Sequence, residues 1–280
     1  AAQTDLPAVA VSGGRVVALG AQALDLGGEV RDLSPLHLCP APLDAHVHLY
    51  LGGIPRENLF ASRRAGLAGV RDLGCKPGLP WPEAAPGGAR LVASGPGMGI
   101  GWLAEKLRGP EQYGRAAGER VAQGAGVLKI FATGLLDFAN PGQVENPLAV
   151  SAEEMAAVVQ VARANGLKVV THASGRGAVR LALSAGVDSI EHGFFLQEED
   201  LRRLAGEGVA WSPTIAAVAA HAKDPQGRHD SLTKQNLAEI ARTQSGALAL
   251  AADLGVNLVL GSDAGSYGLP HGQALFLEMA

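Results

Sequence analysis

The sequence predicts an α/β protein, a (β/α)8 TIM barrel with a small, partial N-terminal β-sandwich element. Three observations support this fold class. The chain has 280 residues, slightly more than the roughly 250 that one such barrel needs. From about residue 37 onward, short apolar runs alternate with segments of helical composition. Several of these runs have a histidine near their end or an aspartate directly after it, and TIM-barrel active sites form at the C-terminal ends of strands.

Eight short apolar runs rich in β-forming residues are the predicted barrel strands. They cover residues 37–49, 69–73, 90–94, 127–133, 168–173, 189–193, 209–215 and 257–262. Eight strands that alternate with helices argue for a closed parallel barrel. A doubly wound open sheet would explain the alternation equally well, but no G-x-G-x-x-G motif opens a helix after the first strand.

Helix signals lie between most of these runs. Ser-Ala-Glu-Glu at 151–154 is a capping box, which predicts a helix that begins there and ends near Asn165 and Gly166. Further helices are predicted over residues 177–185, 198–205 and 237–254.

The first part of the chain has a different pattern. Residues 8–12 and 15–19, separated by two glycines, predict a β-hairpin. Residues 24–26 and 30–33 are predicted to add two short strands. We therefore expect a partial β-sandwich element at residues 1–38 and the barrel at residues 39–280.

Composition and charge exclude several classes of partner. The net charge is -4 and there is no cluster of Lys and Arg, so no nucleic-acid partner is expected. No run approaches the roughly 20 apolar residues of a membrane span, and the first residues do not resemble a signal peptide. Cys39 and Cys75 are too few for a disulfide framework, which favours reduced thiols in a cytoplasmic protein.

His46 and His48 are the first candidate metal ligands. A lone histidine is more often a surface or satisfied core residue than a ligand. These two, however, stand two apart at the end of the first predicted strand, so their imidazoles should project to the same side. Neutral imidazole is the commonest metal-binding side chain.

Lys129 lies inside the apolar strand at 127–133. Burying an ammonium group is costly, so the lysine is either an edge or ion-paired residue or an amine kept neutral by desolvation. A neutral amine can add carbon dioxide to give a carbamate, an anionic oxygen ligand.

Three further candidates end later strands. His172 ends the fifth predicted strand, His192 the sixth and Asp263 the eighth. Together with His46, His48 and Lys129, they offer nitrogen and oxygen ligands that suit Zn²⁺ or a similar divalent ion.

The segments PLDAHVHL, LKIFATG, VVTHASG, SIEHG and LGSDAG resemble the amidohydrolase superfamily. The chain is most similar to its imidazolonepropionase-like and Xaa-Pro dipeptidase-like members, from about residue 11 to residue 280. The resemblance implies a TIM barrel that holds two divalent metal ions, with zinc as the expected ion. It places one ion on His46, His48 and Asp263, the other on His172 and His192, and a bridging carbamylated Lys129 between them. It also assigns Asp263 the catalytic proton transfer.

Two departures from the family pattern stand out. Relatives often have Gly-Gly-His after the third strand, whereas residues 95–103 contain no histidine. Relatives also continue for roughly a hundred residues through the helices and strands that complete the β-sandwich, so this chain is expected to stop inside the eighth helix. Open edges in the N-terminal element would then favour a longer gene product or a homo-oligomer.

The function predicted by this resemblance is hydrolysis of an amide-type bond in a small peptide or N-acyl amino acid, by metal-activated water. Hydrolysis of a urea, carbamate, ester or lactone remains an alternative. Two further alternatives are less consistent with the sequence. Related single-metal deaminases lack the bridging lysine, which is present here as Lys129. A non-catalytic scaffold would usually have lost metal ligands, and here all six positions are filled.

Specificity lies in the loops after the strands, and residues 140–147 and 266–271 are the segments expected to line the pocket. No role follows from the sequence for His271, Tyr50 or Tyr267 near the mouth. Glu191 should point away from His192 and is interpreted as structural.

Overall fold

The computed structural model describes residues 7–280. They divide into two compact units, with the boundary in the sequence between Pro40 and Ala41. The smaller unit contains the antiparallel hairpin of β1 (Val9–Ser12) and β2 (Arg15–Leu19). Gly13 and Gly14 both have positive φ, at 56° and 74°, as the favoured two-residue hairpin turn requires. The predicted hairpin is therefore confirmed.

The two short strands predicted after the hairpin are wrong. Residues 21–25 form the short helix α1 (Ala21–Asp25), because Ala, Gln and Leu favour helix over strand. Residues 30–33 are exposed and form no strand. Within residues 7–40, the strand pairing observed is that of β1 with β2.

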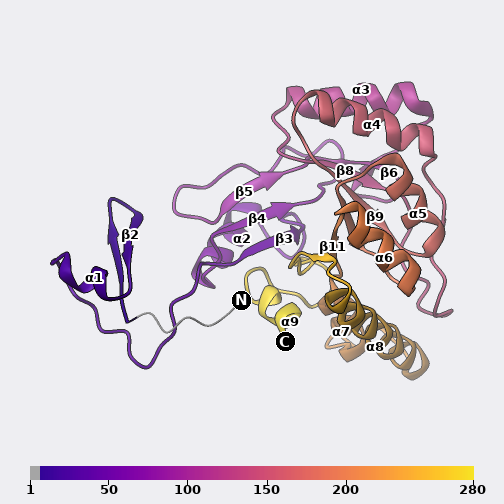
Figure 1. The fold of residues 1–280 in the computed structure, drawn as a ribbon. Coiled ribbons are helices and arrows are strands. Elements are labelled where there is room, and N and C mark those ends of the chain that lie inside the picture. The colour runs from indigo at the N-terminus through magenta and orange to yellow at the C-terminus, as the bar shows by residue number, and fades with distance from the viewer. Residues whose placement is uncertain (1–6) are drawn as a thin grey trace. The chain divides into compact units, whose positions relative to one another are not determined.

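The larger unit contains parallel strands and the helices that connect them (Figure 1). Its strands are β3 (Leu43–Val47), β4 (Gly69–Asp72), β5 (Arg90–Ala93), β6 (Gly97–Gly99), β7 (Ala104–Glu105), β8 (Leu128–Phe131), β9 (Val169–Ala173), β10 (Ser189–His192), β11 (Ala210–Ser212) and β12 (Asn257–Leu258). Its helices are α2 (Pro55–Arg64), α3 (Gly109–Ala122), α4 (Ala152–Ala164), α5 (Arg176–Ala185), α6 (Glu198–Glu207), α7 (Ile215–Lys223), α8 (Ser231–Asp253) and α9 (Gln273–Met279).

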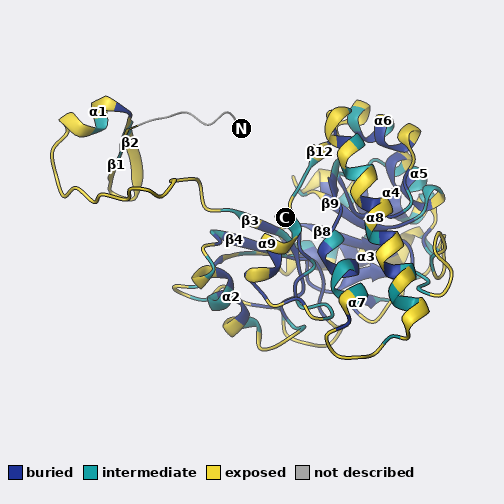
Figure 2. Ribbon diagram, turned by 90° about the horizontal axis from the view of Figure 1, so that it is seen from below, coloured by how far each residue is buried: buried dark blue, intermediate teal, exposed yellow. Residues whose placement is uncertain are grey.

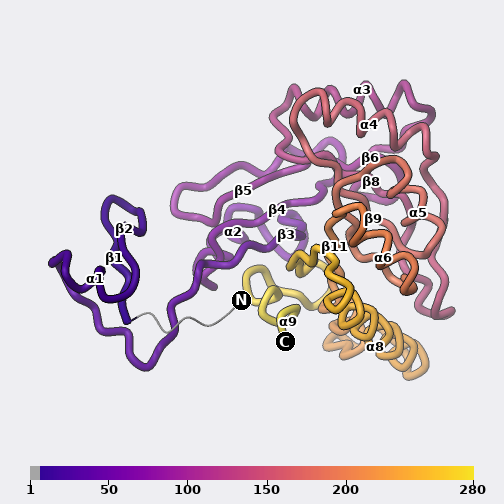
Figure 3. The backbone as a smooth tube through the Cα atoms, in the orientation of Figure 1, coloured from indigo at the N-terminus to yellow at the C-terminus, as the bar shows by residue number. Residues whose placement is uncertain are grey.

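The strands form a three-stranded sheet in the order β3-β4-β5 and a seven-stranded sheet in the order β12-β11-β10-β9-β8-β6-β7. Backbone hydrogen bonds link the two sheets on both sides. Gly126 N donates to Ala93 O at 3.0 Å, beside β5 and β8. Asp263 N donates to His46 O at 2.7 Å, so the segment after β12 lies along β3 (Figure 3). The fold is therefore α/β, parallel and TIM-barrel-like.

A glycine permits this last contact. A Cβ atom at Gly261 would meet Ser212 Oγ at 2.4 Å and His46 Cβ at 2.7 Å. Any larger residue would therefore push the segment before Asp263 away from β3 and β11.

Each of the eight predicted runs contains an observed strand, but the strands are shorter. Residues 37–42 lie outside β3, and β12 ends at Leu258. The predicted helices at 151–165, 177–185 and 198–205 correspond to α4, α5 and α6. The last predicted helix begins earlier than expected, at Ser231, because the Asp230 carboxylate caps it by accepting from Thr233 N.

The core lies between the strands and the inner faces of the helices, which are buried while their outer faces are exposed (Figure 2). The strands β8, β9 and β10 are buried at every residue, as expected for parallel strands covered by helices. Within residues 7–280, none of the helices combines the length and apolar character that a membrane span needs.

The capping box of α4 provides a test of this local structure. Ser151 Oγ accepts from Glu154 N at 3.2 Å, and Glu154 Oε2 accepts from Ser151 N at 2.8 Å. We expect Ser151→Ala to lower the free energy of unfolding by about 1 kcal/mol, measured by chemical denaturation. Ser231→Ala, at an exposed position where Asp230 provides the cap, should change it much less. Equal effects of the two substitutions would contradict the capping role.

Candidate metal centre

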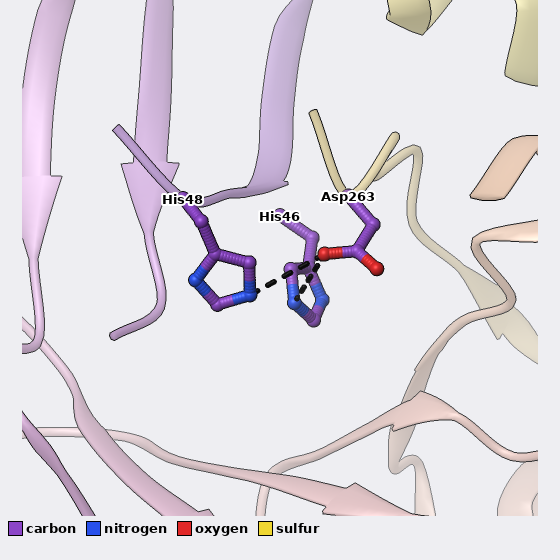
Figure 4. Close-up of side chains that lie close together, drawn as sticks. All are labelled: His46, His48 and Asp263. Atoms are coloured by element: carbon purple, nitrogen blue, oxygen red, sulfur yellow. Dashed lines mark ion pairs between the residues drawn. The ribbon is translucent and has the colours of Figure 1, made fainter. Parts of the chain in front are cut away.

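His46, His48 and Asp263 lie together at the end of β3 (Figure 4). His48 Nε2 lies 3.3 Å and His46 Nε2 lies 3.6 Å from Asp263 Oδ1. In the part of the chain that the structure describes, they form the one group of three or more His, Cys, Asp or Glu residues close enough to share a metal ion. The predicted projection of both imidazoles to one side therefore holds in the structure.

The backbone holds Asp263 in place. Its N–H donates to His46 O, and its φ is 57°, a conformation that non-glycine residues adopt rarely. Burial raises the pKa of Asp263, but the adjacent His48 and His46 imidazoles and Lys129 together outweigh it, so the pKa lies below its usual value. The carboxylate is therefore ionised at neutral pH.

A buried carboxylate fixes the orientation of His46. Glu191 Oε2 lies 2.8 Å from His46 Nδ1, and both side chains are fully buried. Burial raises the pKa of Glu191, but the hydrogen bond from His46 and the charge of Arg71 bring it down to about 2. An ionised carboxylate only accepts hydrogen bonds. His46 Nδ1 therefore bears the ring proton, and its lone pair is on Nε2.

Sequence reasoning missed this role of Glu191, which it interpreted as structural. The contact joins residues 145 positions apart, so no local pattern reveals it. The available signal was an acidic residue within an apolar strand, one position before a candidate ligand. Arg71 Nη2 at 3.0 Å and Ser189 Oγ at 2.6 Å both donate to Glu191 Oε1, which leaves neither carboxylate oxygen unpaired.

Backbone carbonyls orient two more imidazoles. His48 Nδ1 lies 3.2 Å from Gly74 O, and His172 Nε2 lies 3.1 Å from Gly134 O. A carbonyl oxygen only accepts, so the lone pair of His48 is on Nε2 and that of His172 is on Nδ1. Burial lowers the pKa of His46 to about 4 and that of His172 to about 3, assisted by the charge of Lys129. The rings of His46 and His172 are therefore neutral, as metal ligands must be.

His172 and His192 lie next to the first group. The ring centroid of His192 is 4.8 Å from that of His46 and 4.4 Å from that of His172. Thr214 Oγ1 lies 2.7 Å from His192 Nδ1. Burial and the neighbouring imidazoles lower the pKa of His192 well below its usual value. The structure thus places His172 and His192 beside the group formed by His46, His48 and Asp263.

Lys129 is among the most deeply buried polar residues, with 1% of its surface exposed. Its Nζ lies 4.8 Å from the centre of the Phe131 ring and is a buried nitrogen without a hydrogen-bond partner. Burial lowers the pKa of Lys129 to about 8, against the opposing charges of Glu191 and Asp263. The edge or ion-paired interpretation of Lys129 therefore does not describe this residue.

The arrangement fits a divalent ion. His46 Nε2 is fully buried and has no hydrogen-bond partner, although its lone pair would otherwise need one. The lone pairs of His46 and His48 face the Asp263 carboxylate. This set of two imidazole nitrogens and one carboxylate oxygen is a common environment for zinc.

The residues near the mouth make mostly structural contacts. Tyr50 OH donates to Pro80 O, and Tyr267 OH donates to Asp224. His271 is 6% exposed rather than facing solvent, and its Nε2 lies 2.9 Å from Leu51 O. The segment at 140–147 contacts His172 through Gly134. Glu145 O accepts from Gly134 N at 2.8 Å, and Gly134 O is the carbonyl that contacts the His172 ring.

One family model matches most of the chain. A model of the Amidohydrolase family matches residues 38–280. Uncharacterized proteins of Mycobacterium bovis and Mycobacterium tuberculosis are 26% identical over 253 residues, which cover 84% of this chain and 66% of theirs. The chain thus spans somewhat less than two thirds of the length of these relatives.

Solved structures share the fold. A Xaa-Pro dipeptidase with bound methionine superposes with a TM-score of 0.68 at 24% identity, covering 86% of this chain and 70% of that one. A prolidase complexed with N-methylphosphonate-L-proline gives 0.72 at 22% identity, covering 93% and 74%. The A. niger ochratoxinase gives 0.66 at 18% identity, covering 85% and 69%. At these identities the likeness concerns the fold alone.

The contact between Glu191 and His46 leads to a test of the site. In Glu191→Gln the side chain loses its charge, so it holds His46 and Arg71 less firmly. Loss of such an outer partner typically weakens metal affinity about 10–100-fold, and we expect a drop of this size in a zinc competition assay with a chelator. Glu198→Gln, on the exposed start of α6, is the control. Unchanged zinc affinity in Glu191→Gln would show that His46 needs no such partner.

Proposed function

Because the chain belongs to the amidohydrolase family, we propose that it is a metal-dependent hydrolase of amide-type bonds in small peptides or N-acyl amino acids. One observation supports this proposal above the others. His46 presents a buried, unpartnered Nε2 lone pair, with its Nδ1 held by Glu191, beside the ionised Asp263. Burying such an atom is costly unless it binds a ligand, and a divalent ion is the ligand that its neighbours suit.

We also propose that the strands close into an eight-stranded barrel. The hydrogen bonds of Asp263 N to His46 O and of Gly126 N to Ala93 O support closure on both sides of the three-stranded sheet. The hairpin of β1 and β2 would then be the part of a β-sandwich that lies before the barrel.

The proposed site holds up to two ions. His46, His48 and Asp263 would hold the first, and His172 and His192 the second. When bound, such an ion lowers the pKa of a coordinated water and polarises a carbonyl oxygen. The protein residues supply positioning and proton transfer.

We propose that Lys129 bridges the two positions as a carbamate. The lone pair of the neutral Nζ would attack carbon dioxide, forming the N–C bond while one C=O π pair moves to oxygen, and one proton of the attacking nitrogen would then leave to solvent. The support is a buried Nζ without a partner and a pKa lowered to about 8, which favours the neutral, nucleophilic amine. Carbamylation would thus convert the amine into an anionic oxygen ligand near the His46, His172 and His192 imidazoles.

Asp263 is the proposed proton carrier. Its carboxylate is ionised, 15% exposed and within 3.6 Å of both first-site imidazoles. A carboxylate oxygen there can accept a proton from the attacking water and pass it to the leaving nitrogen, as general base and then general acid. This sequence leaves the enzyme unchanged and yields a carboxylic acid and an amine.

A substrate screen tests the function directly. Metal-loaded protein should hydrolyse members of dipeptide and N-acyl amino-acid libraries, detected by release of free amine. Parallel libraries of esters and lactones, followed by release of acid, and of ureas and carbamates, followed by release of amine, serve as comparison. If the protein hydrolyses only those compounds and none of the peptides or N-acyl amino acids, the proposed substrate class is wrong.

Metal content tests the site. We expect purified protein to hold about two divalent ions per chain, measured by elemental analysis after zinc and bicarbonate are supplied. Lys129→Ala should lose the second ion and most activity, whereas Lys168→Ala, an exposed lysine paired with Asp188, should lose neither. Full zinc occupancy in Lys129→Ala would remove the carbamate from the proposal.

Asp263→Asn tests proton transfer. The amide keeps an oxygen ligand but is not basic, so metal affinity should weaken modestly. We expect kcat to fall about 100-fold or more, as for the loss of a positioned general base, with a much smaller change in KM. If this variant retains both ions and a near-normal kcat, another group moves the proton.

A further inference from the structure

Thr214 occupies an unusual place at the start of α7. It is the N-cap residue, where a threonine hydroxyl normally accepts from a backbone N–H of the first turn. Its φ is 50° and its hydroxyl makes no capping bond. Instead, Thr214 Oγ1 lies 2.7 Å from His192 Nδ1. The residue that should cap the helix therefore contacts a proposed metal ligand.

A distant carboxylate performs the capping. Glu278, in α9, accepts from Ile215 N at 3.0 Å through Oε1 and from Ala216 N at 2.7 Å through Oε2. These are N–H groups of the first turn of α7, which have no partner within the helix. A negative charge at this end also interacts favourably with the helix dipole.

Glu278 lies close to the site without touching it. Burial raises its pKa to about 7, the two backbone hydrogen bonds oppose this, and the charges of Asp44 and Asp263 raise it further. A buried carboxylate is unfavourable by itself. The contacts with the α7 backbone are what compensate for its burial there.

The other contacts of His192 hold its backbone rather than its ring. Its carbonyl oxygen accepts from Trp211 Nε1 at 2.9 Å and from Gln244 Nε2 at 2.6 Å. These bonds stabilise a residue whose φ is 69°, but they leave the rotation of the imidazole free. Thr214 Oγ1 is the hydrogen-bond partner that the described structure gives to the ring itself.

We propose that Glu278 is a positioning residue for His192. By capping α7 from a distance, it holds the turn at Thr214 and leaves the threonine hydroxyl for the His192 ring. A neutral ring that donates from Nδ1 has its lone pair on Nε2, the nitrogen available to an ion. The importance of this arrangement for catalysis rests on the proposed function, but the arrangement itself can be tested without metal or substrate.

Nuclear magnetic resonance of ¹⁵N-histidine-labelled, metal-free protein reports the His192 ring directly. His192→Asn assigns its signals. We expect Thr214→Val and Glu278→Ala both to shift the His192 ring nitrogens, and the double variant to shift them little more than either alone. Glu278→Gln, which keeps one acceptor oxygen, should restore part of the wild-type signal.

Ser151→Ala is the matched control, since it removes the cap of α4 without a link to His192. It should lower stability while leaving the His192 signal in place. If Glu278→Ala lowers stability in the same way and leaves the His192 ring signals unchanged, Glu278 is only a structural cap and the proposal is wrong.

Zinc affinity provides the second measurement. We expect Glu278→Ala to weaken binding of the second ion about tenfold, at the low end of losses for outer-sphere partners, with the first ion retained. Zinc binding at both positions with wild-type affinity in Glu278→Ala would overturn the proposal. If the wild-type chain binds no zinc, the proposed function fails, whereas the His192 ring signals still decide the role of Glu278.

Discussion

The hydrogen bond between the His46 imidazole and the Glu191 carboxylate is the contact on which the rest of the site depends. Both groups are fully buried, so either one alone would be a costly polar group in an apolar interior. Together, and with Arg71 and Ser189 on the other oxygen, they are satisfied. Removing one member would leave its partners uncompensated, an effect that exceeds the loss of one hydrogen bond.

This contact determines which atom of His46 is available for chemistry. Glu191 accepts a hydrogen bond from His46 Nδ1, so Nε2 faces Asp263 with a lone pair. Three of the surrounding residues, His192, Thr214 and Asp263, have positive φ, and each such conformation costs about 1–3 kcal/mol. Hydrogen bonds to the His192 carbonyl and to the His46 carbonyl hold two of them. These three are half of the six non-glycine residues with positive φ in the described chain.

The sequence predicted those features that depend on local pattern. Alternation along β3 placed His46 and His48 on one side, and the capping box located the start of α4. Lys129 was conspicuous because an apolar strand rarely contains a charge.

Features that depend on contacts between distant segments could not be predicted. Glu191 acts on a residue 145 positions away, and Glu278 on residues more than 60 positions away. Their identities alone suggest surface acids. The strand expected at 30–33 failed for a related reason, since a short β-forming run becomes a strand only when a partner pairs with it.

The joint between β3 and the segment after β12 also has a consequence for how the site forms. Asp44 accepts from Ser262 N across 218 positions, so the first and last ligands of the proposed first ion come from opposite ends of the larger unit. Closing so long a loop is entropically costly and slow. A ribosome must have released nearly all of this unit before His46, His48 and Asp263 can meet. Capture of an ion by these three side chains would then be a late event, possible only after Asp263 has been synthesised and has reached β3.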